Sequence, residues 1–162
     1  MGLCHVAHDC RIHNDVIIAN GSLVAGHVEI FDKAIVSGQV AIHQFSRIGR
    51  LGMAAGLSRI TRDIPPFMIV YGEGTVIGPN SVGMRRAGFS SEARQAVRRA
   101  FRLMYRSAHT IAEALKLMAA APATPEVAEI AEFAAGSKRG LCSHHRFLAQ
   151  GKGRDAAAEE RY

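Results

Sequence analysis

The stretch from Val6 to Pro65 reads, in blocks of six residues, VAHDCR, IHNDVI, IANGSL, VAGHVE, IFDKAI, VSGQVA, IHQFSR, IGRLGM, AAGLSR and ITRDIP. Every block but one begins with Val or Ile, and the exception begins with Ala54. The fifth place of the block is mostly small or β-branched. A helix repeats every 3.6 residues and a half-buried strand every two, so neither gives an unbroken period of six.

This period predicts a parallel β-helix of short strands over residues 1–66. Each block forms one flat side of the solenoid, and its first residue points into a narrow core of β-branched side chains. Gly and Asn in ANG, AGH and SGQ are expected at the corners, where a positive φ costs them little. A chance run of β-branched residues in a sandwich is the alternative, and ten consecutive blocks argue against it.

Composition narrows the class of protein. The chain has 162 residues, enough for one domain with a small appendage, and a net charge of +6 that comes mostly from Arg in its second half. This charge favours an anionic partner, whereas the lack of Trp and the scarcity of other aromatics disfavour nucleic acid. Cys4, Cys10 and Cys142 show no CxxC spacing, which indicates reduced thiols. We expect a cytoplasmic protein without a signal peptide or a transmembrane segment.

The second half of the chain has a different pattern. Pro65 and Pro66 cannot donate ladder hydrogen bonds, so the solenoid is expected to close there and residues 67–89 to form an irregular or β connection. A helical region is predicted for residues 90–140, with Ser90 as a cap, Thr110 and Glu113 as a capping box, and a last helix from Thr124-Pro125 to Gly136. Residues 141–162, with His144 and His145, are predicted to be a polar tail.

Several segments together resemble one hexapeptide-repeat family. HVAHDC, ANGSLVAGHV, VAIHQFSRIG, DIPPFMIVYG and PNSVGMRRAGFS are similar, motif after motif, to the UDP-N-acetylglucosamine O-acyltransferases, over residues 5–107 and more loosely to residue 140. The resemblance implies a left-handed β-helix, a helical C-terminal region and a homotrimer with its active site between neighbouring solenoids. It also implies the first acyl transfer of lipid A biosynthesis. The 3-hydroxyacyl donor is then carried on the phosphopantetheine of an acidic acyl-carrier protein, without a further cofactor, and the acceptor is the 3-hydroxyl of a UDP-sugar.

Histidines gather near the start of the chain. His5, His8, His13 and His27 occupy different places in their blocks, which argues against a metal site, so none is expected. Three blocks make one coil, so residues eighteen apart stack. His8 then lies beneath Gly26 and Gly26 beneath Gln44, with His27 and His43 beside this column.

Acyl transfer needs a base near the attacking hydroxyl and a donor for the oxyanion. His8 suits the first role and the Gly26 N–H the second, although spacing alone leaves open that corner histidines merely cap turns. The resemblance gives the matching positions these roles. It adds Asp9 as the partner of the base, and it places His5, His27, His43 and Gln44 at the sugar or acyl end of the substrate. His13 matches no family motif and is expected to be a surface residue.

Further site residues rest on the resemblance alone. It implies that Asn80 and Arg86 reach the nucleotide diphosphate, and Arg suits phosphate through paired hydrogen bonds. Val82 and Ala87 depart from residues that many family members carry beside them. Met53 and Gly56 fall where side-chain size is expected to limit acyl length, so Gly56 favours a longer chain.

The largest departure is length, because family members have roughly as much solenoid again before the position of His5. Met1 would begin in mid-solenoid, and the first coil would expose Val and Ile. We expect a piece or mis-started reading of a normal enzyme, a shortened paralogue covered by assembly, or an inactive remnant that serves as a scaffold. A hexapeptide acetyltransferase that uses acetyl-coenzyme A is the alternative enzyme.

Overall fold

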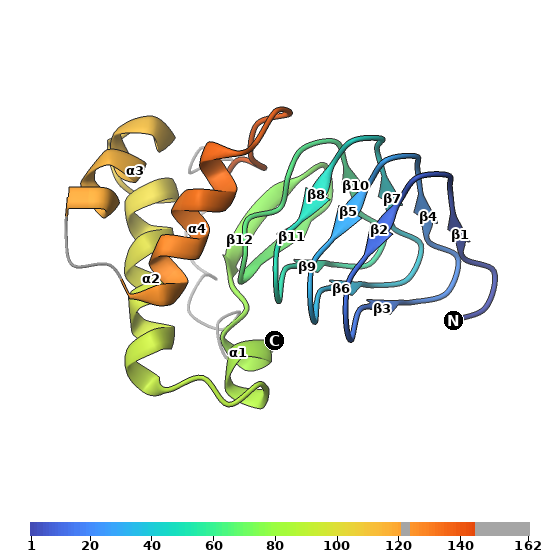
Figure 1. Ribbon diagram of the computed structural model, residues 1–162, viewed down its shortest axis with the longest axis horizontal. Helices are drawn as coiled ribbons and strands as arrows, with labels where there is room; N and C mark the ends of the chain where they lie inside the picture. The colour runs from blue at the N-terminus through green and yellow to red at the C-terminus, as the bar shows by residue number, and fades with distance from the viewer. Residues whose placement is uncertain (121–123, 145–162) are drawn as a thin grey trace, which may run out of the picture.

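The computed structural model describes residues 1–120 and 124–144, and its N-terminal part is a left-handed parallel β-helix (Figure 1). Strands of two residues recur every six residues, as the period predicts. They are β1 (His5–Val6), β2 (Arg11–Ile12), β3 (Ile17–Ile18), β4 (Leu23–Val24), β5 (Glu29–Ile30), β6 (Ile35–Val36), β7 (Ala41–Ile42), β8 (Arg47–Ile48), β9 (Met53–Ala54) and β10 (Arg59–Ile60). The predicted fold class is confirmed.

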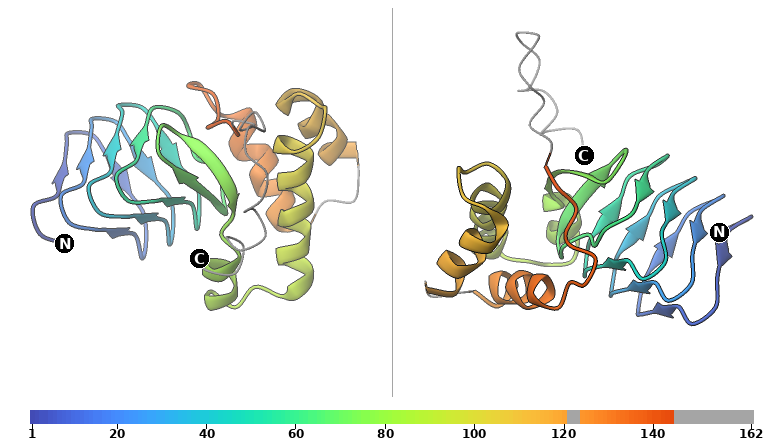
Figure 2. Two further views of the ribbon diagram at one scale, coloured as in Figure 1. Left: turned by 180° about the vertical axis from the view of Figure 1, so that it is seen from behind. Right: turned by 90° about the horizontal axis from the view of Figure 1, so that it is seen from above.

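Every third strand pairs in parallel, which makes three flat faces. The first sheet has the order β1-β4-β7-β10, the second β2-β5-β8, and the third contains β3, β6 and β9. His5 lies opposite Leu23 and Leu23 opposite Ala41, so the register between coils is eighteen residues. Figure 2 shows the stacked coils from behind and from above.

The second residue of each strand faces the core, as predicted. Most of these residues are fully buried: Val24, Ile30, Val36, Ile42, Ile48, Ala54 and Ile60. The fifth place of the block adds Val28, Ala34 and Val40, which are buried as well. In the first coil Val6 and Ile12 remain 43% and 40% exposed.

The corners differ from the prediction. Positive φ falls on the fourth residue of nine of the ten blocks, from Asp9 to Leu57, and Gly21 is the one glycine among these nine. The prediction that Gly and Asn would take this conformation is therefore wrong at "AGH" and "SGQ", where His27 and Gln39 have it. Each of these two residues donates its N–H to a carbonyl of the coil below, His27 to His8 and Gln39 to Asn20. The ladder thus offsets the cost of a left-handed conformation, about 1–2 kcal/mol per residue.

The solenoid also continues beyond the two prolines. β11 (Met68–Tyr71) pairs in parallel with β9, and β12 (Thr75–Pro79) pairs antiparallel with β11. The predicted closure at Pro65-Pro66 is wrong, because the prolines occupy a corner and the ladder resumes with the bond from the Phe67 N–H to the Arg50 carbonyl, 2.8 Å. Ile69 faces Met53, so this coil is two residues shorter than the others.

Four helices follow in the described part of the chain: α1 (Ser81–Arg86), α2 (Ser91–Tyr105), α3 (Ile111–Ala120) and α4 (Pro125–Ala135). The predicted caps are confirmed. The Ser90 hydroxyl accepts from the Ala93 N–H at 3.2 Å, and Thr110 and Glu113 form reciprocal bonds. The short helix α1 was not predicted and lies inside the expected irregular connection. None of the described helices is long and apolar enough to cross a membrane.

Residues 141–144 pack against the body, which corrects the predicted start of the polar tail. Leu141 forms an isolated parallel β-bridge with Asp63, and Ser143 forms one with Thr75. His144 Nδ1 lies 2.7 Å from the Val76 carbonyl. Burial raises the pKa of the Cys142 thiol to about 12, and all three cysteines are free thiols. His145 and the rest of the predicted tail lie outside the described residues.

A buried ion pair joins the solenoid to the helices. Asp63, 1% exposed, accepts from Arg47 Nε at 3.1 Å, from the Arg47 N–H at 2.8 Å and from the Ser137 hydroxyl at 2.7 Å. Arg47 in turn donates to the Phe133 carbonyl of α4 at 2.8 Å. Because this carboxylate serves three donors, it fixes where α4 meets the solenoid.

We expect Asp63→Ala to lower the free energy of unfolding by about 3 kcal/mol, because it leaves the Arg47 guanidinium without its buried partner. Glu73→Ala is the matched control, since it breaks the exposed Arg59–Glu73 pair (2.7 Å) and should cost less than about 1 kcal/mol. Urea denaturation at one protein concentration measures both. Equal losses in the two variants would contradict this role of Asp63.

Candidate active site

The candidate site lies along one edge of the solenoid, between the first and second sheets. We call this the site edge and define it by the corner loops 7–10, 25–28 and 43–46, which stack over one another. The His27 N–H donates to the His8 carbonyl at 3.1 Å, and the Phe45 N–H donates to the Gly26 carbonyl at 3.2 Å. The predicted eighteen-residue column of His8, Gly26 and Gln44 therefore exists at this edge.

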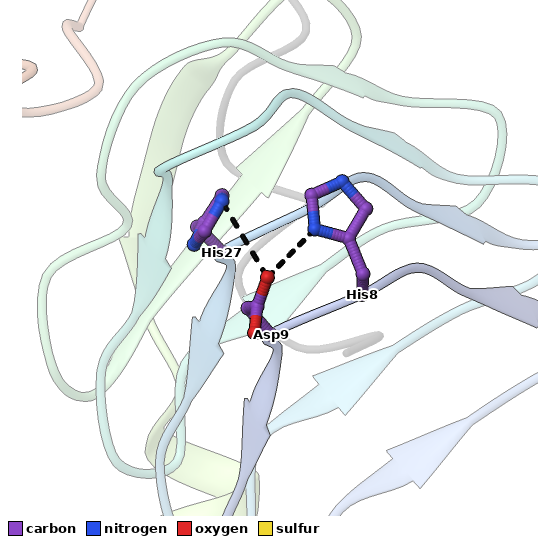
Figure 3. A group of neighbouring side chains, drawn as sticks. All are labelled: His8, Asp9 and His27. Atoms are coloured by element: carbon purple, nitrogen blue, oxygen red, sulfur yellow. Dashed lines mark hydrogen bonds and ion pairs between the residues drawn. The ribbon is translucent and has the colours of Figure 1, made fainter.

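His8 and Asp9 form the central pair of the site (Figure 3). His8 Nδ1 lies 2.8 Å from Asp9 Oδ2. The hydrogen bond from His8, with the attraction of the nearby His27, holds the pKa of the Asp9 carboxyl below its usual range. An ionised carboxylate only accepts hydrogen bonds, so the proton of a neutral His8 imidazole belongs on Nδ1. Nε2 then keeps its lone pair and is the basic nitrogen.

The basic edge of His8 faces Gly26 in the next coil. A Cβ atom placed on Gly26 would lie 2.8 Å from both Nε2 and Cε1 of His8, closer than packed atoms approach. A side chain at position 26 would therefore displace the His8 imidazole from this place. Within the described residues, no protein group accepts a hydrogen bond from the Gly26 N–H. An unpaired N–H in the residue that the His8 ring contacts is the kind of donor an oxyanion site requires.

His27 completes a cluster around Asp9. Its Nε2 lies 3.8 Å from Asp9 Oδ2, and its ring meets the His8 ring edge-on at 5.1 Å between centroids. The other face of His27 stacks on Phe45 at 4.8 Å, with 9° between the planes. Phe45 was not singled out from the sequence, although its place eighteen residues after His27 was the signal that could have found it.

The remaining residues predicted near the sugar lie around this cluster. His5 begins β1 just before the first corner, and His43 and Gln44 form the third corner, where His43 Nδ1 lies 3.1 Å from the Gln44 carbonyl. All three are exposed, and among the described residues no hydrogen bond or ion pair joins them to His8. They extend the polar surface of the site edge along the solenoid.

Other predicted site residues are not brought to this edge in the single chain. Met53 begins β9 on the third sheet and Gly56 follows at the next corner. Arg86 is an exposed residue at the end of α1. His13, left outside the site, pairs with Glu29 at 3.0 Å and stacks on Phe31 at 4.8 Å.

Asn80 has a structural role that the sequence did not indicate. It is 4% exposed and caps α1: its Oδ1 accepts from the Gly83 N–H at 2.9 Å, and its Nδ2 donates to the Leu51 carbonyl at 2.9 Å. A Cβ on Gly83 would collide with this amide. Asn80 therefore fixes the helix that carries Arg86, and its amide is already engaged by the protein.

The site edge contains three side chains that could bind a metal ion. His8, Asp9 and His27 each offer a donor atom, and these atoms lie within 4.8 Å of one another. The different block places of the histidines predict no metal site. In the structure, however, the third place of one coil and the fourth place of the next share a corner, which brings His8 and His27 together. His5 and His13 do not belong to the cluster.

Fold and site edge together define a class of fold, the left-handed β-helix of hexapeptide repeats. Within this class, residues 63–142 match the family described as UDP-N-acetylglucosamine O-acyltransferase, domain 2. The chain is also similar to an acyl-(acyl-carrier-protein)–UDP-N-acetylglucosamine O-acyltransferase of Synechocystis sp., with 47% identity over 128 residues that cover 78% of this chain and 46% of that one.

Solved structures agree with the sequence relatives. The UDP-N-acetylglucosamine acyltransferase of Campylobacter jejuni superposes with a TM-score of 0.83 at 34% identity, covering 88% of this chain and 56% of the other. The Bacteroides fragilis enzyme gives a TM-score of 0.81 at 40% identity, with 85% and 55% covered. The chain spans about half the length of the curated relatives it matches.

We expect Asn80→Ala to lower the free energy of unfolding by about 2 kcal/mol, because both the N-cap and the buried bond to Leu51 are lost. Ser90→Ala removes the exposed cap of α2 and serves as the control, with an expected loss of about 1 kcal/mol. Thermal or urea unfolding distinguishes them. An Asn80→Ala protein as stable as the wild type would contradict the structural role.

Proposed function

We propose that this chain transfers a 3-hydroxyacyl group from acyl-carrier protein to the 3-hydroxyl of UDP-N-acetylglucosamine. The curated relatives are named for acyl-carrier protein and for this UDP-sugar, and they align with 78% to 87% of the chain. The observation that carries the proposal is the position of His8, which bonds Asp9 through Nδ1 and presents Nε2 to Gly26 of the next coil. A base in contact with a residue whose N–H is unpaired is the combination that acyl transfer requires.

The reaction follows from this arrangement. His8 Nε2 takes the proton of the sugar hydroxyl as its oxygen attacks the thioester carbonyl. The Gly26 N–H donates to the oxyanion, and collapse of the tetrahedral intermediate expels the pantetheine thiolate, which regains a proton from His8. The chain needs no cofactor of its own for these steps, since the acyl group arrives on phosphopantetheine. Asp9 stabilises the His8 imidazolium that exists between the two proton transfers.

The proposal extends to the partners and the cellular setting. Exposed Arg residues on α1 and α2 would attract an acidic carrier protein, and Arg86 would meet the nucleotide diphosphate. Because Arg86, Met53 and Gly56 lie away from His8 in one chain, a homotrimer would bring a neighbour's residues to each site edge. The reaction would then be the first step of lipid A biosynthesis, in the cytoplasm.

The test is acyl transfer from 3-hydroxyacyl carrier protein to UDP-N-acetylglucosamine by the wild type and by His8→Ala. Loss of the base should lower turnover by about 10²–10⁴-fold with the fold intact by circular dichroism. His13→Ala is the matched control, because this histidine also pairs with a carboxylate and stacks on a Phe ring, outside the site edge. It should retain wild-type turnover.

The other outcomes would contradict the proposal. Equal activity in wild type and His8→Ala would exclude His8 as the base. A folded wild type without transfer would favour an inactive scaffold, and stimulation by acetyl-coenzyme A alone would favour an acetyltransferase. Light scattering on the same samples tests the trimer, which an active monomer would overturn.

A further inference from the structure

Three metal-ligating side chains converge at the site edge without a metal role in the proposed reaction. They are His8 and Asp9 of the first corner loop and His27 of the second, and each side chain is substantially exposed: 73%, 66% and 42%. We propose that this triad binds Zn²⁺ and that the bound ion blocks His8 as a base. The binding rests on geometry alone, and its inhibitory effect rests on the proposed function.

The distances suit a tetrahedral ion. Ligand atoms at about 2.0–2.1 Å from zinc in tetrahedral geometry are about 3.3 Å apart. Here Asp9 Oδ2 lies 2.8 Å from His8 Nδ1 and 3.8 Å from His27 Nε2, and all three donors lie within 4.8 Å of one another. Shifts of less than about 1 Å in exposed side chains therefore complete three ligand bonds, and solvent supplies the fourth.

The donor set selects the kind of ion. Two imidazole nitrogens and one carboxylate oxygen match zinc and its neighbours among the divalent transition metals. Magnesium and calcium bind mainly oxygen ligands, so the same triad should not hold them. Zinc is therefore the ion we assign.

His27 is held in place for this role by its neighbours. Its ring stacks on Phe45, and the N–H groups of both residues are tied into the ladder of the site edge. Support of this kind orients a ligand before the ion arrives. His13 has the same stacking on Phe31 and a carboxylate partner in Glu29, but it belongs to no group of three donors among the described residues. His13 is therefore the control residue for metal binding by the triad.

The consequence for catalysis follows from the two imidazole tautomers. Without metal, Nδ1–H of His8 points to Asp9 and Nε2 holds the lone pair that accepts the hydroxyl proton. Zinc needs the Nδ1 lone pair, so the proton of a neutral ring moves to Nε2. The ring stays neutral and no proton is gained or lost. Nε2 is then a donor that cannot act as the base.

The binding test uses Co²⁺ as a spectroscopic probe on tag-free protein. We expect visible absorption typical of a tetrahedral site at one Co²⁺ per chain, displaced by Zn²⁺ but not by Mg²⁺. His27→Ala should weaken Zn²⁺ binding more than about tenfold, since a lost ligand costs at least as much as a lost outer partner. Asp9→Asn preserves the shape of the side chain and should weaken binding similarly, whereas His13→Ala should bind like the wild type. Unchanged affinity in the two triad variants, or loss in His13→Ala, would overturn the site.

The inhibition test adds Zn²⁺ to the acyl-transfer assay with wild-type protein. Turnover should fall as Zn²⁺ fills the site, by at least about tenfold at saturation, and EDTA should restore it. Full activity with the site occupied would overturn the inhibitory effect. A wild type that binds Zn²⁺ through the triad but shows no transfer would overturn the proposed function and leave the zinc site standing.

Discussion

The structure depends on the parallel backbone ladder that repeats every eighteen residues. Together, the N–H to carbonyl bonds between two coils hold the three two-residue strands of each coil and the corners between them. The ladder carries the left-handed backbone of large residues such as His27 and Phe45, a conformation that costs about 1–2 kcal/mol per residue by itself. The same register puts the first residue of each block, Val or Ile in all but one, over that of the next coil. Core and site edge are thus two consequences of one spacing.

At the site edge, the ladder brings together residues that are far apart in the sequence. Asp9 follows His8 directly in the chain, so their hydrogen bond is local. Gly26 and His27 reach the same place only through the next coil. Each coil contributes a different residue to this corner. Because Gly26 has no side chain, the His8 ring can lie across the boundary between the two coils. A shift of the register by one residue would remove this contact.

The period of six was enough to predict the strands, the core and the column of His8, Gly26 and Gln44. It did not predict the coil beyond Pro65-Pro66, because a corner tolerates prolines and the periodic pattern is lost where the coil shortens. It also did not predict the buried role of Asn80, since its partner Leu51 lies 29 positions away and no local pattern connects them. The family resemblance supplied the residue roles, and geometry then separated those near His8 from those placed elsewhere in the chain.

The central claim is that the contact between His8 and Gly26 forms the reacting centre, and acyl transfer by Gly26→Ala tests it most directly. Gly38→Ala is the control, because Gly38 also occupies the middle of a corner, and a Cβ there would lie at an ordinary 3.5 Å from the Asn20 carbonyl. We predict a loss of about a hundredfold or more in turnover for Gly26→Ala and near wild-type turnover for Gly38→Ala, with both proteins folded. Equal turnover in the two variants would contradict the account.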